Sequence, residues 1–518
     1  MALLARAAAL TAALAATANA LYINGSVIAP CDSPIYCHGE LLKQVELAQP
    51  FSDSKTFVDM PAIKPLEEIQ AAFDKLEKPL SNNSALNDFL DEYFADAGGE
   101  LVAVPEDQLT TDPVFLNRIN DTVIQEFTKK VIDIWPDLTR QYSPSSSSNC
   151  TSCPNSFIPV NHTFVVAGGR FREPYYWDSY WVIEGLLRTG GSFTEISKNI
   201  IENFLDFVED YGFVPNAARI YYLNRSQPPL LSLMIQTYVD YTNDTEILDR
   251  ALPLLVKEHE FFMNNRTVDV QVGNKTYTLN RYAVENTQPR PESYREDYIT
   301  ARNSSYYAES GIVYPETVPL NDSQVATLYS HLASGAESGW DYTSRWIANP
   351  EDGARDPSVW PPLMHILMQG LRNTPATFGE DDPSYVEVQD LALRLGQRYL
   401  DSTFCTWLAT GGGSTSETPK LQGLSDQDVG IMFEKYADNS TNRAGGGGEY
   451  EVVEGFGWTN GVLIWTVDEF GNQLQRPDCG DLQAAHTTQK RDVQSAVELH
   501  VRDGSRVKKF GKRAKRSV

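Results

Sequence analysis

Aromatic and charged side chains gather in a few short stretches of this sequence. The stretch YYWDSYW at 175–181 follows GGRF at 168–171, and ESGWD at 337–341 comes later. Aromatic rings pack on the C–H faces of sugars, while carboxylates and arginines hydrogen-bond to sugar hydroxyls. A single stretch of this kind is equally typical of an aromatic core. Several of them in one chain indicate a carbohydrate site.

Two proline-containing loops each add an arginine with polar neighbours, RSQPP at 225–229 and RPESY at 290–294. Either loop alone is more typical of a capped turn, but together they could present rigid donors to a ligand. Further along, Glu434 precedes a run of glycines that leads to Glu449 and Trp458. Glycine lets the backbone come close to a ligand.

Other chemistries lack their motifs. The glycine run at 445–448 has no Gly-Lys-Ser/Thr ending, which argues against nucleotide binding. The chain contains no Gly-x-Ser-x-Gly and no His-Glu-x-x-His, and its seven histidines show no zinc-ligand spacing. The residues therefore argue against a nucleotide site and a zinc site. The remaining carboxylates, tryptophans and arginines fit glycoside hydrolysis, in which one carboxylic acid protonates the leaving oxygen and a second carboxylate acts on water or the anomeric carbon.

The amino-acid composition and net charge limit the kinds of molecule that this protein could bind. A chain of 518 residues with 42% hydrophobic residues can bury a large core. Its 69 acidic against 43 basic residues give a net charge of −26, which would repel nucleic acid and anionic membranes but not a neutral sugar. After the N-terminus no run reaches the roughly 18 apolar residues of a transmembrane helix. The oligomeric state is not indicated.

Several signals predict secretion. Residues 1–20 read as a signal peptide that ends in a small-x-small cleavage pattern. The six cysteines are an even number, and the Cys150–Cys153 spacing, which could also suit a redox motif or half a zinc site, is interpreted as part of a set of structural disulfides of open pairing. The sequence also has twelve Asn-x-Ser/Thr glycosylation motifs, at Asn24, Asn82, Asn120, Asn149, Asn161, Asn224, Asn243, Asn265, Asn274, Asn303, Asn321 and Asn439.

The elements that must position these side chains are mostly helices. Apolar residues at 3-4 spacing predict helices over 193–208, 230–241, 244–263, 360–371 and 384–403. The first should begin with a capping box formed by Ser192 and Glu195 and end at Gly212. A β-hairpin is expected at 267–279, around Gly273-Asn274. We therefore predict an all-α, α/α domain over 21–479, followed by a basic, disordered tail over 480–518.

Taken together, these stretches resemble the trehalase family of glycoside hydrolases, and the match runs over roughly residues 35–475. The stretches that carry it, in family order, are SDSKTFVD at 52–59, GGRFREPYYWDSY at 168–180, PNAARIYYLNRSQPP at 215–229, RPESY at 290–294, AESGWD at 336–341, FEKY at 433–436, GGGEY at 446–450 and GFGWTNGV at 455–462. The secretion signals resemble those of the secreted animal enzymes.

The resemblance implies a toroid of six α/α hairpins and hydrolysis of α,α-trehalose to glucose with inversion. It makes Asp341 the general acid and Glu434 the general base. Glu337, four residues before Asp341, could be mistaken for the acid. The resemblance also implies that no metal and no cofactor is required. The resemblance also assigns substrate contacts to Arg170, Phe171, Trp177, Asp178, Asn216, Arg225, Ser226, Gln227, Arg290, Glu292, Gly339 and Glu449.

The sequence departs from the family after residue 346. Family members have a long helical stretch there, with a Gln-Trp-Asp signature that helps to form the substrate pocket. Here only residues 346–359 intervene before Trp360. About a hundred residues, or several helices, are missing by this comparison. Their loss should expose apolar faces of neighbouring helices. Three hypotheses follow: an active trehalase, a catalytically impaired sugar-binding or misfolded product, and a secreted α/α glycosidase acting on longer glycans.

Overall fold

The computed structural model describes residues 21–143, 150, 152–302, 320–340, 358–446 and 452–484. All of them belong to one unit, which ends at Ala484. The predicted signal peptide, nearly all of the predicted tail and the 341–357 segment lie outside the described residues. Asp341 and Glu449 lie outside them too.

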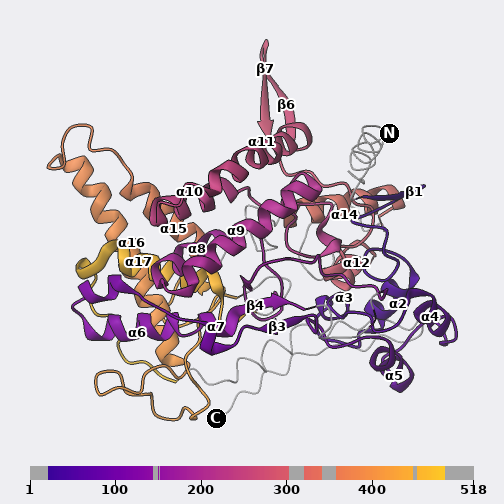
Figure 1. Cartoon of the computed structure of the whole chain (residues 1–518), viewed down its shortest axis with the longest axis horizontal. Helices are drawn as coiled ribbons and strands as arrows, with labels where there is room; N and C mark the ends of the chain where they lie inside the picture. The colour runs from indigo at the N-terminus through magenta and orange to yellow at the C-terminus, as the bar shows by residue number, and fades with distance from the viewer. Residues whose placement is uncertain are drawn as a thin grey trace, which may run out of the picture. The chain divides into compact units, whose positions relative to one another are not determined.

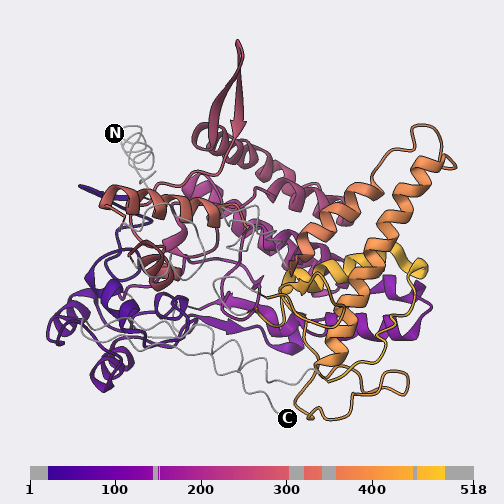
Figure 2. The same ribbon diagram turned by 180° about the vertical axis from the view of Figure 1, so that it is seen from behind.

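Helices are the main regular structure of the described chain and strands are few (Figures 1 and 2), which confirms the all-α prediction. The helices are α2 (Glu40–Ala48), α3 (Lys55–Val58), α4 (Leu66–Phe73), α5 (Ser84–Tyr93), α6 (Thr122–Ile132), α7 (Trp135–Leu138), α8 (Asp178–Thr189), α9 (Ser192–Tyr211), α10 (Leu231–Thr242), α11 (Ile247–Asn265), α12 (Tyr294–Arg302), α14 (Asp322–Glu337), α15 (Pro361–Arg372), α16 (Pro383–Ala409) and α17 (Gly457–Phe470). Short 3-10 turns are η1 (Glu106–Gln108), η2 (Val114–Arg118), η3 (Ile220–Tyr222), η4 (Pro291–Ser293) and η7 (Gly471–Gln473).

The strands are short and form four small antiparallel sheets within the described residues. They are β1 (Tyr22–Asn24), β2 (Val27–Ala29), β3 (Leu101–Ala103), β4 (Thr139–Tyr142), β5 (Phe164–Val165), β6 (Thr267–Val272), β7 (Lys275–Asn280), β8 (Ser358–Val359) and β9 (Tyr436–Ala437). The β6–β7 pair confirms the predicted hairpin, and Gly273 between them has a φ of 63°. A positive φ at a two-residue turn favours glycine.

The predicted helices occur close to their expected bounds. The patterns at 230–241 and 244–263 become α10 and α11, and Asn243 between them takes a left-handed conformation with a φ of 59°. The patterns at 360–371 and 384–403 become α15 and α16. Because these helices have one apolar face that must be buried, the spacing of apolar residues located them.

The start of α9 differs from its prediction. Gly191 is the N-cap residue, and no side chain caps the helix, so the capping box of Ser192 and Glu195 is wrong. The Ser192 hydroxyl instead donates to the backbone oxygen of Thr110, at 3.3 Å, and the Ser192 N–H donates to the same oxygen at 3.1 Å. A tertiary contact therefore replaced the local cap. The predicted end is confirmed, since Gly212 closes the helix with a φ of 86°.

Helices α8 and α17 form the centre of the core. Almost every side chain of both helices is buried. Their backbones come into direct contact at two glycines, because a Cβ atom on Gly461 would lie 1.8 Å from the Trp181 carbonyl oxygen, and one on Gly185 would lie 2.6 Å from the Gly461 Cα. Helices α6, α10, α15 and α16 pack around this pair. The N-terminal ends of α8 and α17 therefore occupy fixed positions.

Three disulfides confirm the predicted structural role of the cysteines. They join Cys31 to Cys37, Cys150 to Cys153, and Cys405 in α16 to Cys479 near the end of the described chain. In the part of the chain that the structure describes, no helix is both long enough and apolar enough to cross a membrane.

Candidate active site

One pocket collects side chains from stretches that are far apart in the sequence. Eleven of the predicted site residues line it: Arg170, Phe171, Trp177, Asp178, Asn216, Arg225, Gln227, Arg290, Glu292, Gly339 and Glu434. Five other lining residues were not predicted from the sequence: Tyr175, Tyr222, Ala336, Phe456 and Trp458. Each of the five lies within a stretch that carries the family resemblance or next to a predicted site residue. Their presence in those stretches was the signal that could have identified them.

Two glycines shape the loop that carries Arg170 and Phe171. Gly168 and Gly169 both have positive φ angles, and the Phe171 N–H donates to the Gly168 carbonyl at 3.0 Å. A Cβ atom on Gly169 would lie 2.4 Å from a methyl group of Val453. Only glycine fits this close approach, which brings the 168–171 loop against the segment that leads into α17.

The N-terminal end of α8 presents Trp177 and Asp178 to the pocket. Asp178 is the first residue of the helix, where the helix dipole stabilises a negative charge. The backbone N–H of Trp177 donates to the Gln227 side chain at 2.9 Å. Gly339 packs on the Trp177 ring, and a Cβ atom there would lie 2.8 Å from ring carbons. Gln227 and Gly339 therefore fix the position of the indole.

The 215–229 loop folds back on itself through Asn216. The Asn216 N–H donates to the Arg225 carbonyl at 2.9 Å, and its side-chain amide donates to the Ser226 carbonyl at 3.2 Å. Ser226 is not among the lining residues of the pocket. Its hydroxyl donates to the Val214 carbonyl at 2.6 Å, so its contacts support the loop. Arg225 and Gln227, on either side of it, are the residues that reach the pocket.

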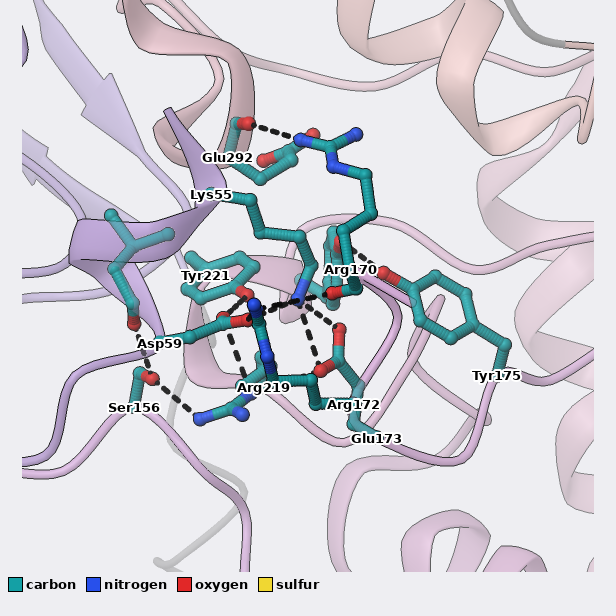
Figure 3. Close-up of polar contacts among 12 residues, drawn as sticks. Lys55, Asp59, Ser156, Arg170, Arg172, Glu173, Tyr175, Arg219, Tyr221 and Glu292 are labelled. Atoms are coloured by element: carbon teal, nitrogen blue, oxygen red, sulfur yellow. Dashed lines mark hydrogen bonds and ion pairs between the residues drawn. The ribbon is translucent and has the colours of Figure 1, made fainter. Parts of the chain in front are cut away.

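Three arginines of the pocket wall are each held by a carboxylate. Arg170 binds Asp53 through Nε and Nη2, both at 2.8 Å. Arg170 also donates to the Glu292 carbonyl at 3.2 Å (Figure 3). Arg290 binds Asp297 through Nε and Nη2, at 2.9 and 2.8 Å. Arg225 pairs with Glu292 through Nη2, and its Nε and Nη1 have no partner among the described residues. Those two N–H groups of Arg225 are donors available to a ligand.

Burial and charge determine the protonation states around Arg225. Burial acts to lower the pKa of its guanidinium, but the Glu292 carboxylate outweighs this and raises the pKa above its usual value. The hydroxyls of Tyr175 and Tyr222 lie 2.8 Å apart, and burial raises the pKa of both phenols well above the usual range. The pocket therefore presents a permanently charged arginine beside two neutral phenols.

Backbone hydrogen bonds hold Glu434, another lining residue of the pocket, in place. Its N–H donates to the Val453 carbonyl at 2.9 Å, and its carbonyl accepts from the Trp458 indole N–H at 2.8 Å. The Glu434 side chain is buried. Asp341 and Glu449, the other carboxylates predicted for the site, lie outside the described residues. Gly339, two residues before Asp341, lines the pocket.

Glu337 has a structural role. It is fully buried and binds the guanidinium of Arg266 through both carboxylate oxygens, at 2.7 and 2.8 Å. It also accepts the Ser226 N–H at 2.9 Å. Because both oxygens are used, Glu337 holds the 215–229 loop against the end of α14 and is not a lining residue of the pocket.

Comparisons with known proteins identify the relatives of this chain. The family model described as Trehalase matches residues 49–357 and 355–471. The chain is 33% identical to "Trehalase" of Homo sapiens over 86% of this chain and 91% of that protein. It is 33% identical to "Trehalase" of Pimpla hypochondriaca (85% and 90%) and 30% identical to "Trehalase" of Dictyostelium discoideum (89% and 94%).

This chain belongs to the trehalase family. Its helical content and its family membership agree with the predicted α/α toroid. The two segments matched by the trehalase model meet at residues 355–357. The alignment with the human trehalase runs over 551 positions, although 86% of this 518-residue chain is only about 445 residues. The alignment therefore contains many positions at which the human trehalase has a residue and this chain has a gap.

Trehalases are glycosidases, and their chemistry requires carboxylates and hydrogen-bond donors around a sugar. The pocket supplies both. In the part of the chain that the structure describes, no group of three or more His, Cys, Asp or Glu side chains could hold a metal ion.

Proposed function

We propose that this chain hydrolyses α,α-trehalose to two molecules of glucose. The observation that carries this proposal is the single pocket in which Arg170, Asn216, Arg225, Arg290 and Glu434 come together from separate stretches. A sugar with many hydroxyls needs such a set of charged and polar groups, with tryptophan faces to pack against its rings. Membership of the trehalase family, whose relatives carry that name, identifies the sugar.

In the proposed mechanism, Asp341 is the general acid and Glu434 is the general base. Glu434 takes a proton from water as the water oxygen attacks one anomeric carbon, while Asp341 gives its proton to the glycosidic oxygen as the C–O bond breaks. One glucose leaves with that oxygen, and the other takes the water oxygen with inverted configuration. An inverting pair requires about 6.5–9.5 Å between the carboxyl groups, which leaves room for the water.

Glucose release by the wild type, Asp341→Asn and Glu434→Gln tests these roles. Loss of a general acid or base should lower the rate about 10²- to 10⁴-fold. Trehalose binding, followed by the fluorescence of the tryptophans in the pocket, should persist in both variants. Asp240→Asn, an exposed change on α10, is the control and should retain full activity. Equal activity of all the variants would contradict the assignment.

The stereochemistry can be measured separately. Because only one C–O bond of α,α-trehalose breaks, inversion should release equal amounts of α- and β-glucose before mutarotation, whereas retention should release only the α form. Proton NMR during the first minutes distinguishes the two outcomes. An initial product without β-glucose would exclude the inverting mechanism.

Secretion is part of the proposal. A signal peptide over 1–20, three disulfides and twelve glycosylation motifs support an extracellular protein. Expression in a eukaryotic secretory host should give a glycosylated protein in the medium whose N-terminus is Leu21. A protein retained inside the cell with Met1 intact would contradict this proposal.

A second candidate, sugar binding without catalysis, is supported by the short segment after residue 346. The unfilled positions in the alignment with the human trehalase and the break in the family match at 355–357 favour it. If the wild type binds trehalose but is as inert as Asp341→Asn, the binding function replaces the hydrolytic one. Sequencing the transcript across codons 346–360 would show whether a longer chain is also made.

A further inference from the structure

The segment 51–59, which carries the family motif SDSKTFVD but has no role in the mechanism above, lies directly behind the pocket wall. Asp53 binds the guanidinium of Arg170 in a bidentate pair, with both distances 2.8 Å. Ser54 donates to Glu296 at 2.7 Å, and Arg295 donates to the Ser52 carbonyl at 2.8 Å. This segment therefore contacts both the 168–173 loop and the 290–297 segment, and each of these contributes an arginine to the pocket.

A buried cluster of charges anchors the C-terminal part of the same segment (Figure 3). The Lys55 ammonium lies between Asp59 and Glu173, at 2.6 and 2.7 Å. Arg219 contacts Glu100 at 2.6 Å and Glu173 at 3.2 Å. With Arg172, which binds Asp59 at 3.0 Å, the cluster has three cations and three carboxylates.

The cluster is balanced and held rigidly. Lys55, Asp59, Glu100, Glu173 and Arg219 are each fully buried. Burial acts to raise the pKa of Asp59, but Arg219 and Lys55 outweigh it and lower the pKa to about 2. A buried ionic cluster is not in itself a strong source of stability, because desolvation opposes the Coulomb attraction. It does fix geometry, since any displacement would leave a buried charge without its partner.

From these contacts we infer that Asp53 is a positioning residue for Arg170. Asp53 holds the guanidinium plane in one orientation toward the pocket, and the Lys55 cluster fixes the segment that carries Asp53. A bidentate carboxylate pair restricts an arginine far more than a single hydrogen bond does. The role of Arg170 as a sugar ligand rests on the proposed function, whereas its orientation by Asp53 does not.

Asp53→Asn tests this inference, because Asp53 is partly exposed and its loss should leave the fold intact. Arg170 is nearly buried, with 11% of its side chain exposed. Phenylglyoxal should therefore modify it slowly in the wild type and several-fold faster in Asp53→Asn, as mapped by mass spectrometry of the peptide. For trehalose hydrolysis, KM should rise and kcat/KM should fall about 10- to 100-fold, the size of effect seen when a supporting residue is removed. Asp53→Glu, which keeps the charge, should recover part of this loss.

Asp244→Asn is the matched control. It removes the Lys198–Asp244 pair, whose carboxylate is exposed to a similar extent, 24% against 29% for Asp53. This control should change neither Arg170 labelling nor KM. A purely structural defect would lower the active fraction, and thus the apparent kcat, without raising KM.

A double-mutant cycle completes the test. If Asp53 acts through Arg170, Asp53→Asn should add almost nothing to the loss caused by Arg170→Lys. Unchanged Arg170 labelling together with unchanged KM would overturn the inference. A wild type that neither binds nor hydrolyses trehalose would overturn the proposed function instead, and the labelling rates would still decide whether Asp53 positions Arg170.

Discussion

The pocket wall and the outer faces of the helices are built in opposite ways. Behind the wall, charged side chains are buried, and each has an oppositely charged partner, as in the Lys55 cluster and the Glu337–Arg266 pair. On four helices, large apolar side chains are exposed to solvent: Leu233 and Tyr241 on α10, Leu252, Val256 and Met263 on α11, Ile366 and Leu367 on α15, and Val386 and Leu391 on α16. Charges are inside in one region, and apolar groups are outside in the other.

This difference shows that, within the described residues, the side chains behind the pocket wall have their packing partners, whereas those on the outer helix faces do not. Burying paired charges is costly, and the pocket wall keeps them because they orient the site. On α11, Leu252, Val256 and Met263 are four and seven residues apart, so they lie on one side of the helix. An apolar stripe of this kind normally packs against another element. The exposed stripe supports the proposal that this chain lacks helices which other trehalases have.

The largest change in stability should come from breaking the buried Glu337–Arg266 pair behind the pocket wall. Glu337→Ala leaves the Arg266 guanidinium buried without its carboxylate and should lower the free energy of unfolding by about 3–5 kcal/mol. Urea denaturation measures this. As a control, Asp244→Asn breaks the partly exposed Lys198–Asp244 pair and should cost much less. Equal costs for the two variants would show that burial does not distinguish the wall from the surface.

Glu258 joins the two regions, since it lies on the inner side of α11 and accepts a hydrogen bond from Tyr176 at 2.5 Å. Burial raises the pKa of Glu258 to about 7, and the Tyr176 hydrogen bond only partly opposes this. The folded state therefore keeps a proton that the unfolded state loses above pH 4.5. The contribution of protonated Glu258 to the free energy of unfolding should be complete below pH 4.5. It should fall by roughly 3 kcal/mol as the pH rises from there through 7.

Glu258→Gln should lack this pH dependence, because glutamine is neutral like the protonated acid. We expect the difference in unfolding free energy between the variant and the wild type to shift in favour of the variant between pH 5 and pH 7.5. Denaturant unfolding at both values measures that shift. A difference that stays constant with pH would mean that Glu258 is not protonated in the folded protein.

The smallest effect should come from the exposed stripe. Val256→Lys should change the free energy of unfolding by less than about 0.5 kcal/mol, because the side chain is already 58% exposed. It should also reduce aggregation and the binding of a hydrophobic dye. Phe262→Ala, on the inner side of the same helix, should cost about 3–5 kcal/mol. If Val256→Lys is as costly as Phe262→Ala, the stripe is covered in solution.

Sequence reasoning succeeded where the information is local. The spacing of apolar residues located α10, α11 and α15 to within three residues, because each helix must bury one face. It also located α16, which continues six residues beyond the predicted end at 403. The β6–β7 hairpin followed from the turn at Gly273 and Asn274. The family resemblance also supplied eleven residues that line the pocket. The residue types alone left each single stretch open to interpretation as an aromatic core or a capped turn. The capping box at Ser192 was wrong because Thr110, from a distant segment, binds that serine instead.

Only the tertiary structure decided the partners of the charged groups. Arg170 is held by Asp53, which is 117 positions away, and the Glu337 carboxylate is occupied by Arg266, 71 positions away. The Cys405–Cys479 disulfide joins residues 74 positions apart, and Ser226 donates its N–H to Glu337, 111 positions away. The sequence by itself determined which side chains could do the chemistry and which segments form helices. The partner of each charged side chain depends on how distant segments pack, and the local spacing of residues does not contain that information.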